Sequence, residues 1–120
     1  MARTSVEDMA FSSVFPLLIQ KAERKGRTRE EVVAVTAWLT GCTPAQIDEA
    51  LVSGITYGAF FSSAPDWNPR SEKITGKVCG VQVETIEDPL MKKIRQLDKL
   101  IDELAKGKPM EKVIRSITHD

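Results

Sequence analysis

The sequence predicts a mainly α-helical domain, a compact orthogonal bundle around one long C-terminal helix, with a single β-hairpin beside it. Three patterns lead to this prediction. Residues 88–107 have the apolar spacing of one long helix, residues 12–64 hold a series of helix start and stop signals, and residues 73–86 alternate polar and apolar side chains. A length of 120 residues is ordinary for one domain, so we treat residues 1–120 as a single domain.

The long helix has a matching start, periodicity and end. Asp88 can cap the free amide groups of its first turn, Pro89 fits the first helical position, and Gly107 can end it. Its apolar residues recur at steps of three and four, which places them on one helix face: Leu90, Ile94, Leu97, Ile101 and Leu104. We therefore predict that this helix is the spine of the fold.

Four shorter helices are predicted before it. The first begins near Ser12 or Ser13, ends at Gly26, and has its apolar side formed by Val14, Leu17, Leu18 and Ala22. The second and third begin with capping boxes, formed by Thr28 with Glu31 and by Thr43 with Gln46. They end at Gly41 and Gly54. The fourth follows Thr56 and carries aromatic residues that we expect in the core.

The hairpin is predicted over about residues 73–86, with Cys79 and Gly80 as its two-residue turn. This register pairs Val78 with Val81, residue 76 with residue 83, and residue 74 with residue 85. It gathers Ile74, Val78, Val81 and Val83 on one face, which we expect to pack against the long helix because an isolated hairpin is marginally stable.

The chain ends and composition suggest a cytoplasmic protein. Residues 1–11 show no periodicity and predict a poorly ordered lead, a short helix can start at Pro109, and residues 117–120 form a tail. No apolar run resembles a signal peptide or a membrane span, and Cys42 and Cys79 are expected as reduced thiols. Acidic and basic residues balance at 17 each, which gives no overall attraction to nucleic acid or membrane.

No pattern indicates catalysis. His119 is the one histidine and lies next to the last residue, so a Ser-His-Asp or Cys-His arrangement is disfavoured. Cys79 could be a reactive thiol in the hairpin turn, or simply a small residue tolerated beside Gly80. We predict no catalytic residue, no cofactor and no metal site, because no metal-ligand spacing or phosphate-binding glycine loop is present.

The loop at residues 66–71 is the predicted partner surface. Trp and Arg dominate binding hot spots, and Trp67 and Arg70 flank Asn68 in a segment with two turn signals. The alternative, which we favour, is that Trp67 folds back over the core and Arg70 stays solvated.

The helices at residues 29–53 have the outline of a helix-turn-helix. The second of them carries Asp48 and Glu49 and no Lys or Arg, so its approach to phosphates is disfavoured. A different nucleic-acid surface could be formed by the basic C-terminal residues Lys106, Lys108, Lys112 and Arg115.

Several short runs together resemble a family of small bacterial proteins classed as a domain of unknown function. These runs are residues 22–28 (AERKGRT), residues 38–41 (WLTG), Ile74-Thr75-Gly76, Val78-Cys79-Gly80-Val81, residues 86–91 (IEDPLM) and residues 97–107 (LDKLIDELAKG). The resemblance covers about residues 11–115 and implies one compact, mainly helical cytosolic domain, with no catalytic residue or cofactor to transfer. We therefore expect a noncatalytic interaction or regulatory protein that acts on an unidentified protein partner or as a homodimer, with a nucleic-acid-associated protein as the alternative.

Overall fold

The computed structural model describes residues 6–78 and 80–113 and confirms a mainly helical fold. In chain order, the elements are the 3-10 helix η1 (Val6–Asp8), α1 (Phe11–Glu23), α2 (Arg29–Thr40), α3 (Pro44–Ser53), α4 (Tyr57–Ser62), the 3-10 helix η2 (Pro69–Lys73), β1 (Lys77–Val78), β2 (Val81–Gln82), the 3-10 helix η3 (Val83–Thr85), α5 (Pro89–Ala105) and α6 (Met110–Val113).

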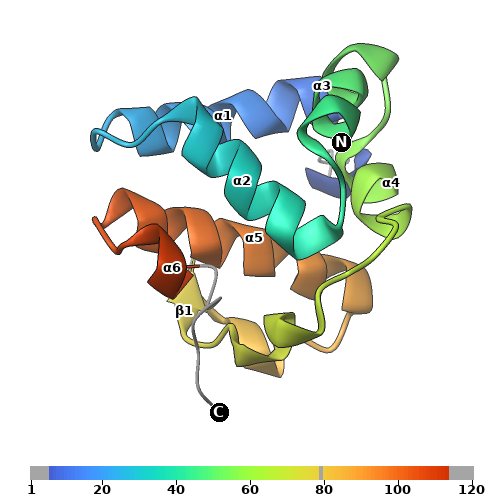
Figure 1. The fold of residues 1–120 in the computed structure, drawn as a ribbon. Coiled ribbons are helices and arrows are strands. Elements are labelled where there is room, and N and C mark those ends of the chain that lie inside the picture. The colour runs from blue at the N-terminus through green and yellow to red at the C-terminus, as the bar shows by residue number, and fades with distance from the viewer. Residues whose placement is uncertain (1–5, 79, 114–120) are drawn as a thin grey trace, which may run out of the picture.

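Helix α5 is the spine, as predicted. The Asp88 side chain accepts hydrogen bonds from the backbone amides of Leu90 (3.0 Å) and Met91 (3.5 Å), which fixes its first turn. The helix contacts α1, α2, α4, α6, β1 and η3. In Figure 1, α1 and α2 lie above α5 and the segment from η2 to η3 lies below it. Its apolar stripe is consequently shared among most of the other elements.

Both predicted capping boxes are present. The Thr28 hydroxyl accepts from the Glu31 amide (3.1 Å) while the Glu31 carboxylate accepts from the Thr28 amide (2.9 Å). Thr43 and Gln46 make the same reciprocal pair at 3.1 and 2.8 Å. These bonds satisfy amides that a helix start otherwise leaves unpaired, so α2 and α3 begin where the sequence indicates.

The buried face of α1 differs from the prediction. Leu17 is 57% exposed, whereas Phe11, Phe15 and Ile19 are buried together with Val14 and Ala22. The reason is an aromatic cluster: the Phe11 ring lies 4.8 Å from Phe15 and 4.2 Å from Phe60, measured between centroids. These contacts rotate α1 away from the face that Leu17 would have provided.

The described part of the N-terminal lead contacts α4. Met9 accepts a hydrogen bond from the Tyr57 amide (2.7 Å), and the Phe11 amide donates to Ile55 (2.8 Å), so residues 9–11 pair with the start of α4. Helix η1 packs on α4. Residues 1–5, the predicted tail at 117–120 and Cys79 lie outside the described residues. The structure therefore does not test the predictions made for them.

The hairpin has the predicted register and a shorter length. Val78 pairs with Val81 and Lys77 with Gln82, but each strand has only two residues. Beyond them, Gly76 takes a φ of 105° and donates its amide hydrogen to the Glu84 carboxylate (2.9 Å), and residues 83–85 turn into η3. The prediction of strands over 73–86 was therefore too long, and Val81, 38% exposed, does not join the buried face of Ile74, Val78 and Val83.

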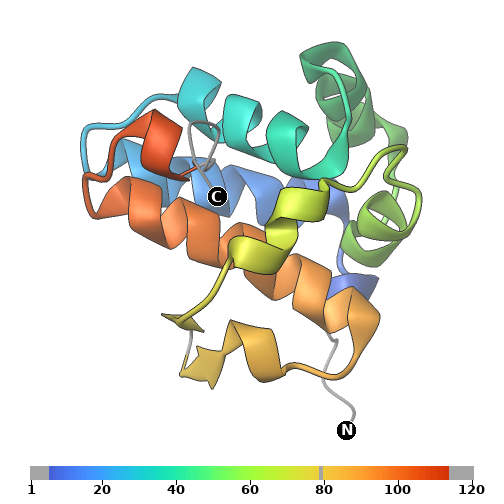
Figure 2. The same cartoon turned by 60° about the horizontal axis from the view of Figure 1, so that its bottom comes forward.

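The hairpin nevertheless packs against α5, as predicted. Elements β1 and η3 both contact α5, and Figure 2 shows this segment running along the side of the helix. No helix in the described part of the chain is both long and apolar enough to cross a membrane.

Candidate functional site

The predicted partner loop is fastened to the end of α2. The amides of Asp66 and Asn68 donate to the carbonyls of Thr40 (3.2 Å) and Leu39 (2.9 Å), and the Asn68 side-chain amide donates to the Trp38 carbonyl (3.0 Å). Carbonyls at the end of a helix lack partners within the helix, and this loop supplies them. Asn68 thus has a structural contact with α2.

Trp67 lies half-buried between the core and α5. Its ring packs edge-on against Phe61 at 5.9 Å between centroids, its indole N–H donates to the Ser71 hydroxyl (3.1 Å), and the Lys93 ammonium lies 5.0 Å from its ring centroid. The side chain of Arg70 lies outside what the structure describes. A role for Trp67, Asn68 and Arg70 as a partner surface stays a prediction.

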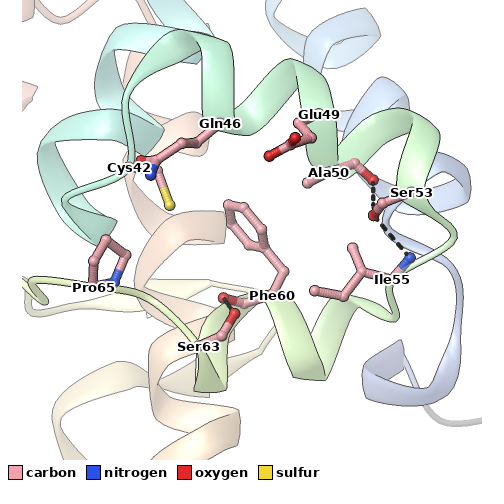
Figure 3. A pocket seen from close by; sticks show the side chains of 9 residues that line it. All are labelled: Cys42, Gln46, Glu49, Ala50, Ser53, Ile55, Phe60, Ser63 and Pro65. Carbon is pink, nitrogen blue, oxygen red and sulfur yellow. Dashed lines mark hydrogen bonds between the residues drawn. The ribbon is translucent and has the colours of Figure 1, made fainter.

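A groove that the sequence did not indicate lies between α3 and α4. Its volume is about 380 Å³. Figure 3 shows the side chains that line it: Cys42, Gln46, Glu49, Ala50, Ser53, Ile55, Phe60, Ser63 and Pro65. We call this the α3–α4 groove.

The groove forms because α3 and α4 diverge from a short connection. Helix α3 ends at Gly54 in the left-handed region (φ 81°), and the Thr56 hydroxyl then caps α4 by accepting from the Ala59 amide (3.1 Å). The Phe60 ring, only 3% exposed, forms the floor with Ala50 and Ile55. Because Phe60 also packs on Phe11 and Phe61, this floor is held in place by the core.

Most of the polar groups around the groove already have partners. The Ser53 hydroxyl donates to the Ala50 carbonyl (3.2 Å) and accepts from the Ile55 amide (3.3 Å), and the Ser63 hydroxyl donates to the Phe60 carbonyl (3.3 Å). The Gln46 carbonyl oxygen is used in the α3 capping box. These groups therefore have limited capacity to bind a ligand.

Glu49 is different. It is the one charged side chain among the residues that line the groove, and within the described chain it makes no hydrogen bond or ion pair through its carboxylate. Figure 3 shows this carboxylate directed toward the space that the lining side chains, including Phe60, surround. The arrangement suits a group that combines an apolar body with a positive charge.

The groove offers no catalytic constellation. The Cys42 thiol points into it and is half-buried, with no histidine among the lining residues to activate it. In residues 6–78 and 80–113, no group of three or more His, Cys, Asp or Glu side chains is arranged to hold a metal ion.

Two of the basic C-terminal residues are paired with nearby carboxylates. Lys106 pairs with Asp102 (3.1 Å) and Lys108 with Glu103 (3.7 Å). A phosphate bound here would compete with these carboxylates. Arg115 and the side chain of Lys112 lie outside the described part of the chain.

Comparison with protein-family models matches residues 5–115 to a family described as "Uncharacterized protein conserved in bacteria (DUF2200)", and the chain belongs to this family. The family resemblance seen in the sequence is thereby confirmed. Among solved structures, the chain is similar to the crystal structure of uncharacterized protein SP1917, with 45% sequence identity, a TM-score of 0.91 and 99% of each chain covered. No match was found among curated proteins.

Proposed function

We propose that this protein is a noncatalytic binding module, whose α3–α4 groove receives an apolar side chain flanked by Lys or Arg from a protein partner. The observation that carries this proposal is a buried apolar floor beneath the unpaired Glu49 carboxylate. An apolar anchor in a preformed depression with a nearby charge is a common way for one protein to recognise another.

The size of the groove supports this role. A volume of about 380 Å³ is at the lower end of the range for ligand pockets and suits one or two side chains. The floor needs no rearrangement, because Phe60 is fixed by its aromatic neighbours on α1 and α4. A preformed site reduces the ordering cost that binding must overcome.

The charges of α3 favour a basic partner over a nucleic acid. The helix contains Asp48 and Glu49 and no Lys or Arg. Asp48 is paired with Arg29 at 3.0 Å, which leaves Glu49 as the charge offered to a ligand. Carboxylates repel a phosphate backbone, so the alternative of a nucleic-acid-associated protein has less support at this surface.

A peptide-display selection with the full chain as bait tests the proposal. We expect enrichment of sequences with an aliphatic or aromatic residue within a few positions of Lys or Arg. Ser63→Trp, which fills the groove, and Glu49→Lys, which reverses its charge, should both abolish the enrichment. Glu23→Lys makes the same charge change on an exposed part of α1 and should leave it intact.

Two results would overturn the proposal. One is an absence of enriched peptides, or an enrichment that both groove variants retain. The other concerns the occupant: if sedimentation shows a dimer that Ser63→Trp disrupts, the groove binds a second copy of this chain instead of a separate partner.

A further inference from the structure

A second, smaller hollow lies beside the Trp67 ring at the start of α5. Its volume is about 180 Å³, and we call it the Trp67 hollow. The residues that line it are Trp67, Ser71, Glu72, Pro89, Lys92, Lys93 and Gln96. It is separate from the α3–α4 groove and shares no lining residue with it.

Two buried polar side chains in its wall have hydrogen-bonding capacity that the described chain does not use. Ser71 and Gln96 are each only 3% exposed. The Gln96 side-chain N–H donates to the Ser71 carbonyl (3.2 Å), and because that carbonyl can only accept, the amide nitrogen must face it and the Gln96 Oε1 faces elsewhere. Within the described residues, this oxygen accepts no hydrogen bond, and because it is not among the fully buried unsatisfied atoms, it is open to solvent.

The Ser71 hydroxyl also has unused hydrogen-bonding capacity, as a donor. It accepts from the Trp67 indole at 3.1 Å, and its own hydrogen is donated to no group in the described part of the chain. Water can satisfy the Gln96 oxygen, because it is open to solvent. An unused acceptor and an unused donor at one hollow allow a ligand that supplies both a donor and an acceptor to replace that water.

The charges around the hollow identify the ligand further. Lys92 and Lys93 provide two ammonium groups, and Glu72 provides a carboxylate. The Lys93 ammonium lies 5.0 Å from the Trp67 ring centroid, so the cation and the aromatic wall are adjacent. Opposite charges on one small site suit a molecule that itself carries both charges.

The volume limits the ligand to a few atoms. Liquid water occupies about 30 Å³ per molecule, so about 180 Å³ corresponds to roughly six waters. We propose that the Trp67 hollow binds a small free α-amino acid. Its carboxylate is held by Lys92, Lys93 and the Ser71 hydroxyl, its ammonium by Glu72 and the Gln96 Oε1, and its side chain packs on Trp67.

Nuclear magnetic resonance of the ¹⁵N-labelled full chain tests this proposal through the indole N–H of Trp67 and the side-chain amide of Gln96. The probes are L-alanine, propionate, which lacks the ammonium, and ethylamine, which lacks the carboxylate. We expect L-alanine to shift both signals saturably with a dissociation constant of about 1 mM or tighter. Each of the other two probes should bind at least about tenfold more weakly, because it leaves one set of charged groups unpaired.

Gln96→Leu removes the unused acceptor and should weaken L-alanine binding roughly tenfold. Gln20→Leu makes the same change at an exposed position of α1 and should have no effect. If Gln96→Leu does not fold, the Lys92→Gln and Lys93→Gln double variant, which alters two half-buried side chains at the edge of the hollow, gives the same test.

The proposal is overturned if L-alanine causes no saturable shift, if the three probes act equally, or if the folded variants bind L-alanine as well as the parent protein does. Because the α3–α4 groove plays no part in this titration, its outcome is independent of the proposed protein-binding function.

Discussion

Gly41 ends α2 in the left-handed region and lies directly against the loop that caps the helix. Its φ is 78°, and a Cβ placed on it would lie 2.6 Å from the Asp66 Cβ and 2.7 Å from the Asp66 carbonyl oxygen. Gly54 has a similar φ of 81° with nothing within 4 Å. The two glycines thus share a backbone requirement and differ in crowding.

This pair gives a matched prediction. Gly54→Ala should lower the free energy of unfolding by about 1 kcal/mol, the cost of a left-handed alanine. Gly41→Ala should lower it by about 3 kcal/mol, because the loop at Asp66 must also move. Urea denaturation of both variants measures the difference, and equal losses would show that Asp66 does not crowd Gly41.

Tyr57 carries a buried hydroxyl for which the described chain provides no hydrogen-bond partner. Burial, reinforced by the negative charge of Asp98, raises the pKa of Tyr57 well above its ordinary value. An unsatisfied buried polar group costs about 1–3 kcal/mol.

Tyr57→Phe should therefore stabilise the protein by about 1 kcal/mol, because it removes the unpaired group and keeps the ring contacts with Phe11 and Phe61. The midpoint of urea unfolding measures this change. A loss of 1 kcal/mol or more would mean that the hydroxyl has a partner in solution.

Asp98 predicts a pH dependence. Burial raises the pKa of this carboxyl even though Arg95 lies 2.9 Å away and opposes the shift. Above about pH 4 the unfolded chain has lost this proton while the folded protein still retains it, so the folded state binds more protons and stability falls as pH rises toward the raised folded value.

Asp98→Asn removes this titration. The free energy of unfolding of Asp98→Asn relative to the parent protein should increase as pH rises from about 4 through the folded pKa. Loss of the ion pair with Arg95 changes the free energy of unfolding of the variant by a similar amount at each pH, so the predicted rise with pH remains. If the free energies of unfolding of the two proteins differ by the same amount at every pH in this range, the raised pKa of Asp98 is contradicted.

At the scale of elements, the docking of η1 on α4 depends on Gly58. This glycine lies inside α4, and a Cβ on it would lie 2.9 Å from both the Cβ and the carbonyl oxygen of Glu7. Alanine is favoured over glycine within a helix by about 1 kcal/mol, so the substitution has opposite effects on α4 and on its contact with η1.

We therefore predict that the N-terminal segment decides whether Gly58→Ala lowers or raises the free energy of unfolding. In the full chain it should destabilise the protein by about 1 kcal/mol or more, whereas in a variant lacking residues 1–8 it should be neutral or stabilising. The four unfolding free energies form a double-mutant cycle. Additive effects would show that η1 does not press on α4 in solution.

The local signals in the sequence were reliable where the stabilising contacts are local. The starts of α2, α3 and α5 depend on side chains within three residues of the caps, and all three were predicted. The hairpin register was also predicted, because it follows from the two-residue turn at positions 79 and 80. Its length was not, because the Glu84 bond to Gly76 and the turn into η3 end the strands early.

At the scale of the whole molecule, the choice of buried faces and the α3–α4 groove depend on contacts between distant segments. Leu17 and Phe15 are both plausible core residues from spacing alone, and only the cluster with Phe60 decides between them. The groove results from the angle between α3 and α4, which the signals at Gly54 and Thr56 do not specify. Glu49 consequently appeared in the sequence only as a charge against DNA binding.

A double-mutant cycle tests most directly whether Glu49 recognises a positive charge next to an apolar anchor. The cycle combines Glu49→Gln with replacement of the basic residue in a selected peptide by norleucine, and titration calorimetry measures each affinity. We predict a coupling free energy of about 0.5–1 kcal/mol that diminishes at about 1 M salt, as expected for a partly exposed ion pair. Additive effects within about 0.3 kcal/mol, the same as for a Glu23→Gln control, would contradict the claim.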